Sequence, residues 1–304
     1  MASSGGLTQR RRNAGDAIDE YDSPTNRESS TSIGGNADAG RDDKDQRAGV
    51  ESDDDADGKG SKGNKLTLLE EVLLLGLKDA QGYLSFWNDN ISYVLRGCIL
   101  IELSLRNRIS TVKESRKRPY AEKLLEVVDE RVTGEVLLDE ALKLIKIEKQ
   151  NVGNWIDLMS GETWNLMKIG YQLKQVRERI AKGLVDKGVL RTEKRNFVLF
   201  DMATHPVADH TIKEQLIQRT VDCLLGRGPP ADRRTIAMVC AAYAANVLEN
   251  ALVGLSHSQR EAAFQKVDEI LQEHAALTEK AKAVGTTEIM AGVLSVYTKM
   301  DSLL

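Results

Sequence analysis

The sequence predicts a mainly α-helical protein, in which a single globular helical domain over residues 65–304 carries a protruding β-hairpin and follows a disordered acidic tail over residues 1–64. Three observations predict this fold class. Apolar residues recur at helical spacing through most of the chain after residue 65. Residues 189–207 change to an extended pattern. The first 64 residues are rich in Gly, Ser and Asp and nearly free of large apolar side chains, so burial cannot offset the entropy cost of ordering them.

Capping signals and apolar spacing place the first elements of the domain. Thr67 and Glu70 have the spacing of a capping box and open a helix that runs to about residue 77. The next helix, about residues 89–106, has a suitable N-cap in Asn88 or Asp89. Its predicted buried side consists of Ile91, Val94, Leu95, Cys98, Ile99 and Leu103.

The remaining elements follow from the same patterns. Short strands are predicted at about residues 109–112 and 124–128. Residues 189–190 and 197–200 are predicted to pair as a hairpin around a polar turn at residues 191–196. One further helix is expected to follow residues 133–135 and run through about residue 147, and others are expected at about residues 154–159, 164–187, 210–225, 232–251, 256–274 and 286–299.

Charge and cysteine content limit the classes of function. The tail carries nine basic and fourteen acidic residues, a net charge of −5, and the remainder carries 33 and 32, a net charge of +1. A near-neutral domain lacks the broad basic face that nonspecific nucleic-acid binding requires. The cysteines Cys98, Cys223 and Cys240 lie in apolar helical patterns without metal-ligand spacing, which predicts buried thiols in a reducing compartment.

No targeting or membrane-spanning segment is predicted. The N-terminus lacks the apolar core of a signal peptide, and no stretch reaches the roughly 18 apolar residues that span a bilayer. We therefore expect any membrane contact to be a surface contact from the cytosolic side.

The stretch GYLSFWNDNISYVLRG, residues 82–97, combines an aromatic loop with a helix N-terminus and an arginine. Arg96 lies about two turns into the predicted helix, close to a loop that contains Trp87. The aromatic side chains could enter a membrane interface, while the cation and the helix end could hold a phosphate. The alternative is a loop tucked under the core, with the arginine paired to a carboxylate.

The sequence gives no positive argument for an enzyme or for a cofactor. It lacks a glycine-rich phosphate loop, a zinc-type Cys/His spacing and a nucleophile elbow. Asp201, His205, Asp209 and His210 are close in sequence, but they straddle Pro206 and Asp209 suits a helix N-cap. We therefore expect no metal site there.

A nucleic-acid-binding alternative comes from the order helix, strand, turn, strand over residues 171–199. A winged helix would use cations on the helix and at the wing. Those cations would be Lys174, Arg177, Arg179, Lys194 and Arg195. The neutral domain and the carboxylates Glu178 and Glu193 beside these cations argue against this interpretation.

The tail contains two short patterns. Arg10, Arg11 and Arg12 form a basic cluster in an otherwise acidic segment. Ser52 precedes three aspartates and Ser23 precedes a proline, so both are candidate phosphorylation sites. The alternative is that these residues only keep the tail solvated.

Several long runs closely resemble the Golgi phosphoprotein three family. They are LTLLEEVLLLGLKDAQGYLSFWNDNISYVLRGCILIELSLR, TGEVLLDEALK, NWIDLMSGETWN, YQLKQVRERIAKGLVDKGVL and TEKRNFVLFDMATHP, and they span residues 65 to about 215. The resemblance is weaker through NVLENAL, and it is weakest in residues 111–125 and in the C-terminal third.

The resemblance implies a non-enzymatic peripheral protein of the cytosolic trans-Golgi face, also present in the cytoplasm. Such a protein binds phosphatidylinositol 4-phosphate and packs glycosyltransferases, through their cytoplasmic tails, into vesicles with the COPI coat, so that these enzymes are retained in the Golgi. The implied headgroup residues are Trp87, Arg96, Lys174 and Arg177, and the implied coat-binding residues are Arg10, Arg11 and Arg12.

The physical chemistry of these residues fits that assignment. If residues 164–187 form one helix, Lys174 and Arg177 lie one turn apart on the same face. Arginine offers paired planar donors to phosphate, and tryptophan prefers the membrane interface. Each cation near an anionic surface contributes about 1 kcal/mol, so binding is reversible and needs a second attachment, such as oligomerisation or cargo contact.

The resemblance also gives the hairpin an apolar tip, Phe197 and Val198. A two-stranded hairpin cannot bury all four apolar residues of 197–200 against its own domain, and leaving this pair in water forgoes roughly 1.5–3 kcal/mol per side chain. We expect the tip to meet either the bilayer or a second copy in a homo-oligomer. The neighbouring cations favour the bilayer, and packing onto the domain is the third possibility.

Overall fold

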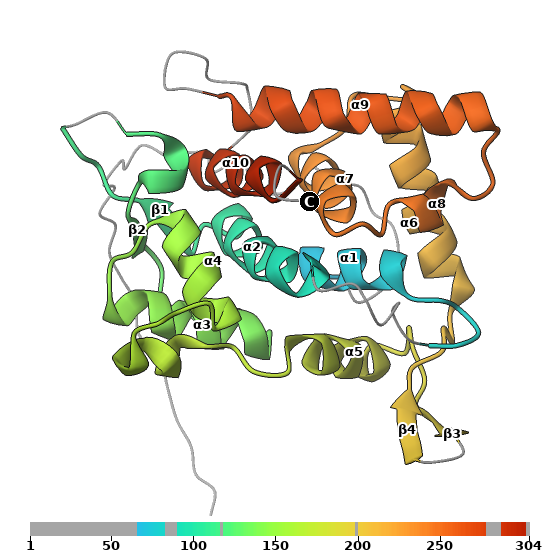
Figure 1. The fold of residues 1–304 in the computed structure, drawn as a ribbon, viewed down its shortest axis with the longest axis horizontal. Coiled ribbons are helices and arrows are strands. Elements are labelled where there is room, and N and C mark those ends of the chain that lie inside the picture. The colour runs from blue at the N-terminus through green and yellow to red at the C-terminus, as the bar shows by residue number, and fades with distance from the viewer. Residues whose placement is uncertain (1–65, 83–89, 116–117, 198–199, 278–286, 302–304) are drawn as a thin grey trace, which may run out of the picture. The chain divides into compact units, whose positions relative to one another are not determined.

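The structure is a computed structural model that describes residues 66–82, 90–115, 118–197, 200–277 and 287–301. Within these ranges the protein is mainly helical, with two small antiparallel strand pairs, which confirms the predicted fold class (Figure 1). None of the described helices has the length and apolar character needed to cross a membrane. The tail and its boundary at residue 64 lie outside the described residues, so that division of the chain stays a prediction.

The elements follow the predicted order, with three exceptions given below. The α-helices are α1 (Leu68–Gly76), α2 (Asn90–Leu105), α3 (Val136–Ile147), α4 (Val152–Ser160), α5 (Val176–Asp186), α6 (His210–Leu224), α7 (Arg233–Ala244), α8 (Glu249–Leu252), α9 (His257–Ala275) and α10 (Glu288–Asp301). The 3₁₀-helices are η1 (Tyr120–Glu122) and η2 (Leu166–Tyr171). The strands are β1 (Ile109–Thr111), β2 (Leu125–Val127), β3 (Glu193–Phe197) and β4 (Phe200–Thr204), paired β1 with β2 and β3 with β4.

Helices α1 and α2 form the centre of the core. Figure 1 shows them between α3 and α5 on one side and α7, α9 and α10 on the other. Every residue of α1 is buried, including Glu70 and Glu71, which pair with Lys187 and Arg219. Its N-terminus carries the predicted capping box, in which Thr67 and Glu70 satisfy each other's backbone N–H groups. The predicted buried side of α2 is confirmed at all six positions.

A buried charge network joins α1, α2, α6 and α7. Glu102 of α2 accepts hydrogen bonds from the Leu68 N–H at 2.8 Å and from Arg234 Nη1 at 3.0 Å. Arg234 also donates to the Leu66 carbonyl at 2.7 Å, and Glu71 accepts from Arg219 at 2.6 Å. Because these partners come from four helices, the network fixes how the helices pack.

The three cysteines are free, as predicted. Cys98 and Cys240 are buried and Cys223 is half-buried. Burial raises the pKa of the Cys98 thiol to about 12. The thiol is therefore protonated and unreactive at neutral pH.

The single long helix predicted for residues 164–187 is wrong. The chain instead forms η2, an extended link and then α5, with Gln175 in the left-handed region at φ 52°. The apolar spacing is continuous, but tertiary contacts engage the backbone of Leu173. Its N–H donates to the Met159 carbonyl at 3.0 Å and its carbonyl accepts from Arg96 at 2.8 Å. These bonds replace the helical ones.

The helix predicted for residues 232–251 is also two elements. Helix α7 ends at Ala244, Asn246 takes a left-handed conformation at φ 54°, and α8 begins at Glu249. Asparagine tolerates this conformation better than most residues, which allows the chain to turn there. The buried side chains of Val247 and Leu248 then fill the bend.

The hairpin exists, but its predicted turn is wrong. Residues 193–197 pair with residues 200–204, so the expected polar turn is mostly strand and the connection falls at Val198 and Leu199. Glu193 is half-exposed, whereas Lys194, Asn196 and Ala203 are exposed. A two-stranded ribbon in solvent does not require an apolar face, so polarity was a poor guide to its turn.

The close approach of α2 and α10 depends on Gly97, and replacing it with alanine should destabilise the protein. A Cβ at Gly97 would lie 2.2 Å from the hydroxyl of buried Tyr297, which donates to the Val94 carbonyl. We expect Gly97→Ala to lower the free energy of unfolding by about 1–3 kcal/mol in urea denaturation.

Gly153 of α4 is the matched control. A Cβ there meets nothing nearer than 3.7 Å. Gly153→Ala should be neutral or stabilising by up to about 1 kcal/mol, because alanine favours helix. Equal effects at the two glycines would contradict the packing seen between α2 and α10.

Candidate functional site

Arg96 is buried in α2 and is held by three backbone carbonyls. Its Nη1 donates to Ser92 at 2.6 Å, its Nε to Met159 at 3.2 Å and its Nη2 to Leu173 at 2.8 Å. These carbonyls belong to α2, to the end of α4 and to the link before α5. The guanidinium therefore fixes the junction of three segments.

No carboxylate among the described residues forms an ion pair with Arg96. The described residues therefore do not support the alternative in which Arg96 is paired to a carboxylate. Burial, and then the positive charge of Arg177, lower the pKa of Arg96 to about 10, and the carboxylate of Glu178 opposes this shift. The side chain stays charged at pH 7. An anion bound beside it would offset the repulsion from Arg177.

Arg177 lies near this guanidinium and Lys174 follows its partner Leu173, but the prediction that the two cations share one helix face is wrong. Lys174 is in the turn before α5, directly after Leu173, and Arg177 is the second residue of α5. Lys174 is exposed and Arg177 half-exposed, and neither forms a side-chain ion pair within the described ranges. The extended link, rather than a helical turn, connects this stretch to Arg96 through the Leu173 carbonyl. We call Arg96, Lys174 and Arg177 the cation cluster.

The N-terminus of α5 adds a partial positive charge to the cation cluster. Its N-cap, Gln175, makes no side-chain capping bond. The first N–H groups of a helix lack intrahelical partners and carry about half a positive charge in sum. Anions bind readily at such a helix end.

Trp87 lies outside the described residues, within the segment 83–89. The structure does fix the two ends of that segment. Gly82 has φ 67° and lies so close to His205 and Pro206 that a Cβ would come within 2.3 Å of Pro206 N. The His205 N–H donates to the Gly82 carbonyl at 2.8 Å, and at the other end Asn90 begins α2. The segment thus runs from the base of the hairpin to the helix that carries Arg96.

The sequence did not predict the carbonyls that hold Arg96 or the left-handed Gln175. Neither has a local signal, because the carbonyls come from residues distant in sequence and a glutamine seldom takes a positive φ. The resemblance did point to Arg96, Lys174 and Arg177, whose role as headgroup residues stays a prediction.

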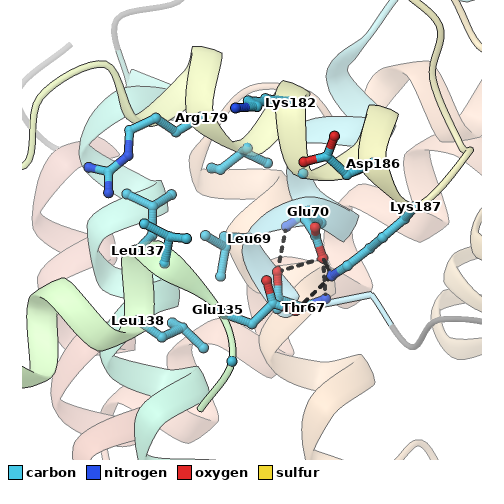
Figure 2. Close-up of a pocket in the computed structure, with 14 residues that line it drawn as sticks. Thr67, Leu69, Glu70, Glu135, Leu137, Leu138, Arg179, Lys182, Asp186 and Lys187 are labelled. Atoms are coloured by element: carbon cyan, nitrogen blue, oxygen red, sulfur yellow. Dashed lines mark hydrogen bonds and ion pairs between the residues drawn. The ribbon is translucent and has the colours of Figure 1, made fainter. Parts of the chain in front are cut away.

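A cleft of about 470 Å³ lies between α1, α3 and α5 (Figure 2). Lys187 lies 2.7 Å from Glu70 and 2.8 Å from Glu135, as the dashed lines in Figure 2 show at one end of the cleft. The lining cations and carboxylates are equal in number: Arg179, Lys182 and Lys187 against Glu70, Glu135 and Asp186. This cleft has no excess positive charge and is a poorer anion site than the cation cluster.

The residues considered as metal ligands have structural roles where they are described. Asp209 is the N-cap of α6, as predicted, and accepts from the Thr211 N–H at 2.9 Å. His210 lies 3.8 Å from Asp79, and His205 is half-buried. Over the described part of the chain, no group of three or more His, Cys, Asp or Glu side chains is placed to hold a metal.

The other predicted binding residues are only partly described. Phe197 pairs with Phe200 at the end of the hairpin, but its side chain and all of Val198 lie outside the description. The cluster Arg10, Arg11 and Arg12 lies in the tail, which is also outside it. Their roles stay predictions.

Comparison with known proteins gives one consistent result. The profile of Golgi phosphoprotein 3 (GPP34) matches residues 68–287, from the start of α1 to the residue before α10. Vacuolar protein sorting-associated protein 74 of Schizosaccharomyces pombe is 53% identical over 279 residues, covering 79% of this chain and 83% of that protein. The protein of the same name from Eremothecium gossypii is 49% identical over 279 residues, covering 79% and 84%. The chain therefore belongs to the Golgi phosphoprotein 3 family, a family of Golgi adaptors.

Proposed function

We propose that this protein is a non-enzymatic peripheral adaptor on the cytosolic face of the trans-Golgi. It binds phosphatidylinositol 4-phosphate through Trp87, Arg96, Lys174 and Arg177, and it links the cytoplasmic tails of glycosyltransferases to the COPI coat, so that those enzymes remain in the Golgi. The observation that supports this most is the cation cluster, whose described members have no carboxylate partner and stand at a helix N-terminus.

Arg96 and the two outer cations have different parts in this site. Arg96 has most of its donors engaged by carbonyls, so it contributes positive charge and holds the link in place. Lys174 and Arg177 have free donors and are accessible, so they contact the phosphate directly. Trp87 would rest at the interface beside them.

The nucleic-acid alternative has less support. Arg179, one of the cations that a recognition helix would need, is 2.5 Å from Glu140 in an ion pair. The domain has almost no net positive charge to attract a phosphate backbone.

Vesicle binding tests the proposal. Replacing Lys174 and Arg177 with alanine should weaken binding to vesicles containing phosphatidylinositol 4-phosphate by about thirtyfold, since each cation contributes about 1 kcal/mol. The control variant, Lys143→Ala with Lys266→Ala, removes two exposed lysines of α3 and α9 and should bind like wild type. Equal binding by both variants would show that the headgroup site is elsewhere.

The same assay addresses the hairpin tip, for which we propose insertion into the bilayer. Phe197→Ser with Val198→Ser should reduce vesicle binding while leaving the molecular mass in solution unchanged. A lower molecular mass in solution would instead show that the tip joins the subunits of a homo-oligomer. A lower melting temperature alone would show that the tip packs in the domain core.

The arginine cluster of the tail is proposed to bind an acidic surface of the COPI coat. Replacing Arg10, Arg11 and Arg12 with alanine should reduce recovery of coat subunits in a pull-down and leave vesicle binding as it is, because the tail and the cation cluster act separately. Undiminished coat recovery would leave the arginines with a solvating role only.

A further inference from the structure

A group of large apolar side chains stands in solvent on the segment between α4 and α5. Trp164 is fully exposed, and Leu166, Met167 and Ile169 are 80%, 90% and 46% exposed. We call these four residues the apolar ridge. Single exposed apolar residues are ordinary, but four of them within six consecutive residues indicate a contact surface.

The segment that carries the apolar ridge is held in a defined conformation. Asn165 caps η2 by accepting from the Met167 N–H at 3.0 Å, and the Asn165 carbonyl accepts from the Lys168 N–H at 2.8 Å. At the far end, Tyr171 packs edge-on against buried Trp155, with 5.6 Å between ring centroids. The backbone is thus secured at both ends, and the exposed side chains are presented outward from a fixed base.

The ridge adjoins the cation cluster along the chain. Residues 172–175 lead directly from η2 to Lys174 and the N-terminus of α5. In Figure 1 the segment between α4 and α5, helix α5 and the β3–β4 hairpin follow one another along the lower edge of the view. Two carboxylates near the ridge could oppose an anionic surface. Glu148 is neutralised by its ion pair with Lys168, at 2.9 Å. Glu162 precedes the ridge in sequence, whereas Lys174 follows it.

We propose that the apolar ridge enters the interfacial layer of an anionic bilayer when the cation cluster engages a headgroup. The inference rests on the proposed function and adds a second, apolar contact to it. A bilayer suits the ridge because tryptophan favours the membrane interface and the adjoining cations favour anionic headgroups. A contact of this kind gives the adaptor affinity that the cations alone do not supply.

An environment-sensitive probe tests the contact without altering the cation cluster. The fluorophore NBD is attached at Leu166→Cys and, as matched control, at Val253→Cys, which is 70% exposed at the end of α8. Wild type treated with the same reagent is the blank for Cys223, since the other two cysteines are buried. Vesicles of phosphatidylcholine with phosphatidylinositol 4-phosphate, or with phosphatidylserine, are then added.

The expected result is a blue shift and quenching by brominated lipid at position 166, and neither at position 253. The variant Trp164→Ser, Leu166→Ser, Met167→Ser should bind vesicles at least about tenfold more weakly, with an unchanged melting temperature because these side chains are already exposed. Val253→Ser should bind like wild type.

Different outcomes separate this inference from the proposed function. Vesicle-bound protein with no shift at position 166 overturns the ridge contact and leaves headgroup recognition standing. A shift at position 166 on both kinds of vesicle, without preference for phosphatidylinositol 4-phosphate, supports the ridge and overturns the headgroup assignment. If the serine variant loses mass in solution but still binds vesicles, the ridge joins two copies of the chain and the inference is wrong. Failure of wild type to bind either vesicle overturns both.

Discussion

Replacing Arg96 with methionine should both destabilise the protein and abolish binding to phosphatidylinositol 4-phosphate. The change removes the guanidinium donor from the carbonyls of Ser92, Met159 and Leu173, of which Met159 still accepts from the Leu173 N–H. An unsatisfied buried polar group costs about 1–3 kcal/mol, and removing a buried charge that lacks a carboxylate partner recovers part of this. We expect the free energy of unfolding to fall by about 1–3 kcal/mol in chemical denaturation.

Two further variants separate the structural role of Arg96 from its charge. Lys174→Ala with Arg177→Ala should lose binding with no loss of stability, since both side chains reach solvent and neither forms a described ion pair. Arg96→Lys keeps the charge but cannot reach three carbonyls in the arginine geometry, so it should recover binding only in part. If Arg96→Met unfolds at the same denaturant concentration as wild type, the three carbonyl bonds do not stabilise the site.

Replacing Glu102 with leucine should have the largest effect on stability. Only about 1% of Glu102 is exposed, and it accepts from the Leu68 N–H, from Arg106 and from Arg234. Its loss leaves buried Arg234 with Glu71, at 3.4 Å, as the ion-pair partner that remains among the described residues. Removing one partner of a buried ion pair lowers the free energy of unfolding by about 3–5 kcal/mol. Urea denaturation followed by circular dichroism measures this.

A double-mutant cycle with Arg234→Met gives the control. If the network acts as a unit, the double variant should be less destabilised than the sum of the single variants, because neither charge is left unpaired. Lys146→Ala, which removes an exposed pair with Glu130, should change stability by less than about 1 kcal/mol. A Glu102→Leu effect no larger than that of Lys146→Ala would contradict the account of the core.

The elements that the sequence predicted well are those whose cause is local. The capping box at Thr67 and Glu70 and the buried face of α2 were both recovered, because capping and periodicity depend on residues within one or two turns. The errors have distant causes. Residues 164–187 have helical spacing throughout, and only Met159 and Arg96, far away in sequence, show why Leu173 leaves the helix.

In the candidate site, too, local patterns were predicted and long-range contacts were not. The shared helix face predicted for Lys174 and Arg177 is wrong, because Lys174 precedes α5 in the extended link that Arg96 holds through the Leu173 carbonyl. The apolar ridge was not predicted at all. Its residues have the composition of a core, and only the fold shows that they stand in solvent. Hydrophobicity in a sequence indicates a buried surface without saying whether the protein itself or a partner buries it.

The central claim is that Arg96, Lys174 and Arg177 form one site for the phosphorylated headgroup. Isothermal titration with a water-soluble, short-chain phosphatidylinositol 4-phosphate tests it most directly, because this ligand excludes contributions from the bilayer, the ridge and the hairpin. Wild type, the serine variant of the ridge and the control Lys143→Ala with Lys266→Ala should each bind one ligand with similar affinity. Lys174→Ala with Arg177→Ala should bind at least about tenfold more weakly. Unchanged affinity in that variant, or no binding by wild type, would contradict the claim.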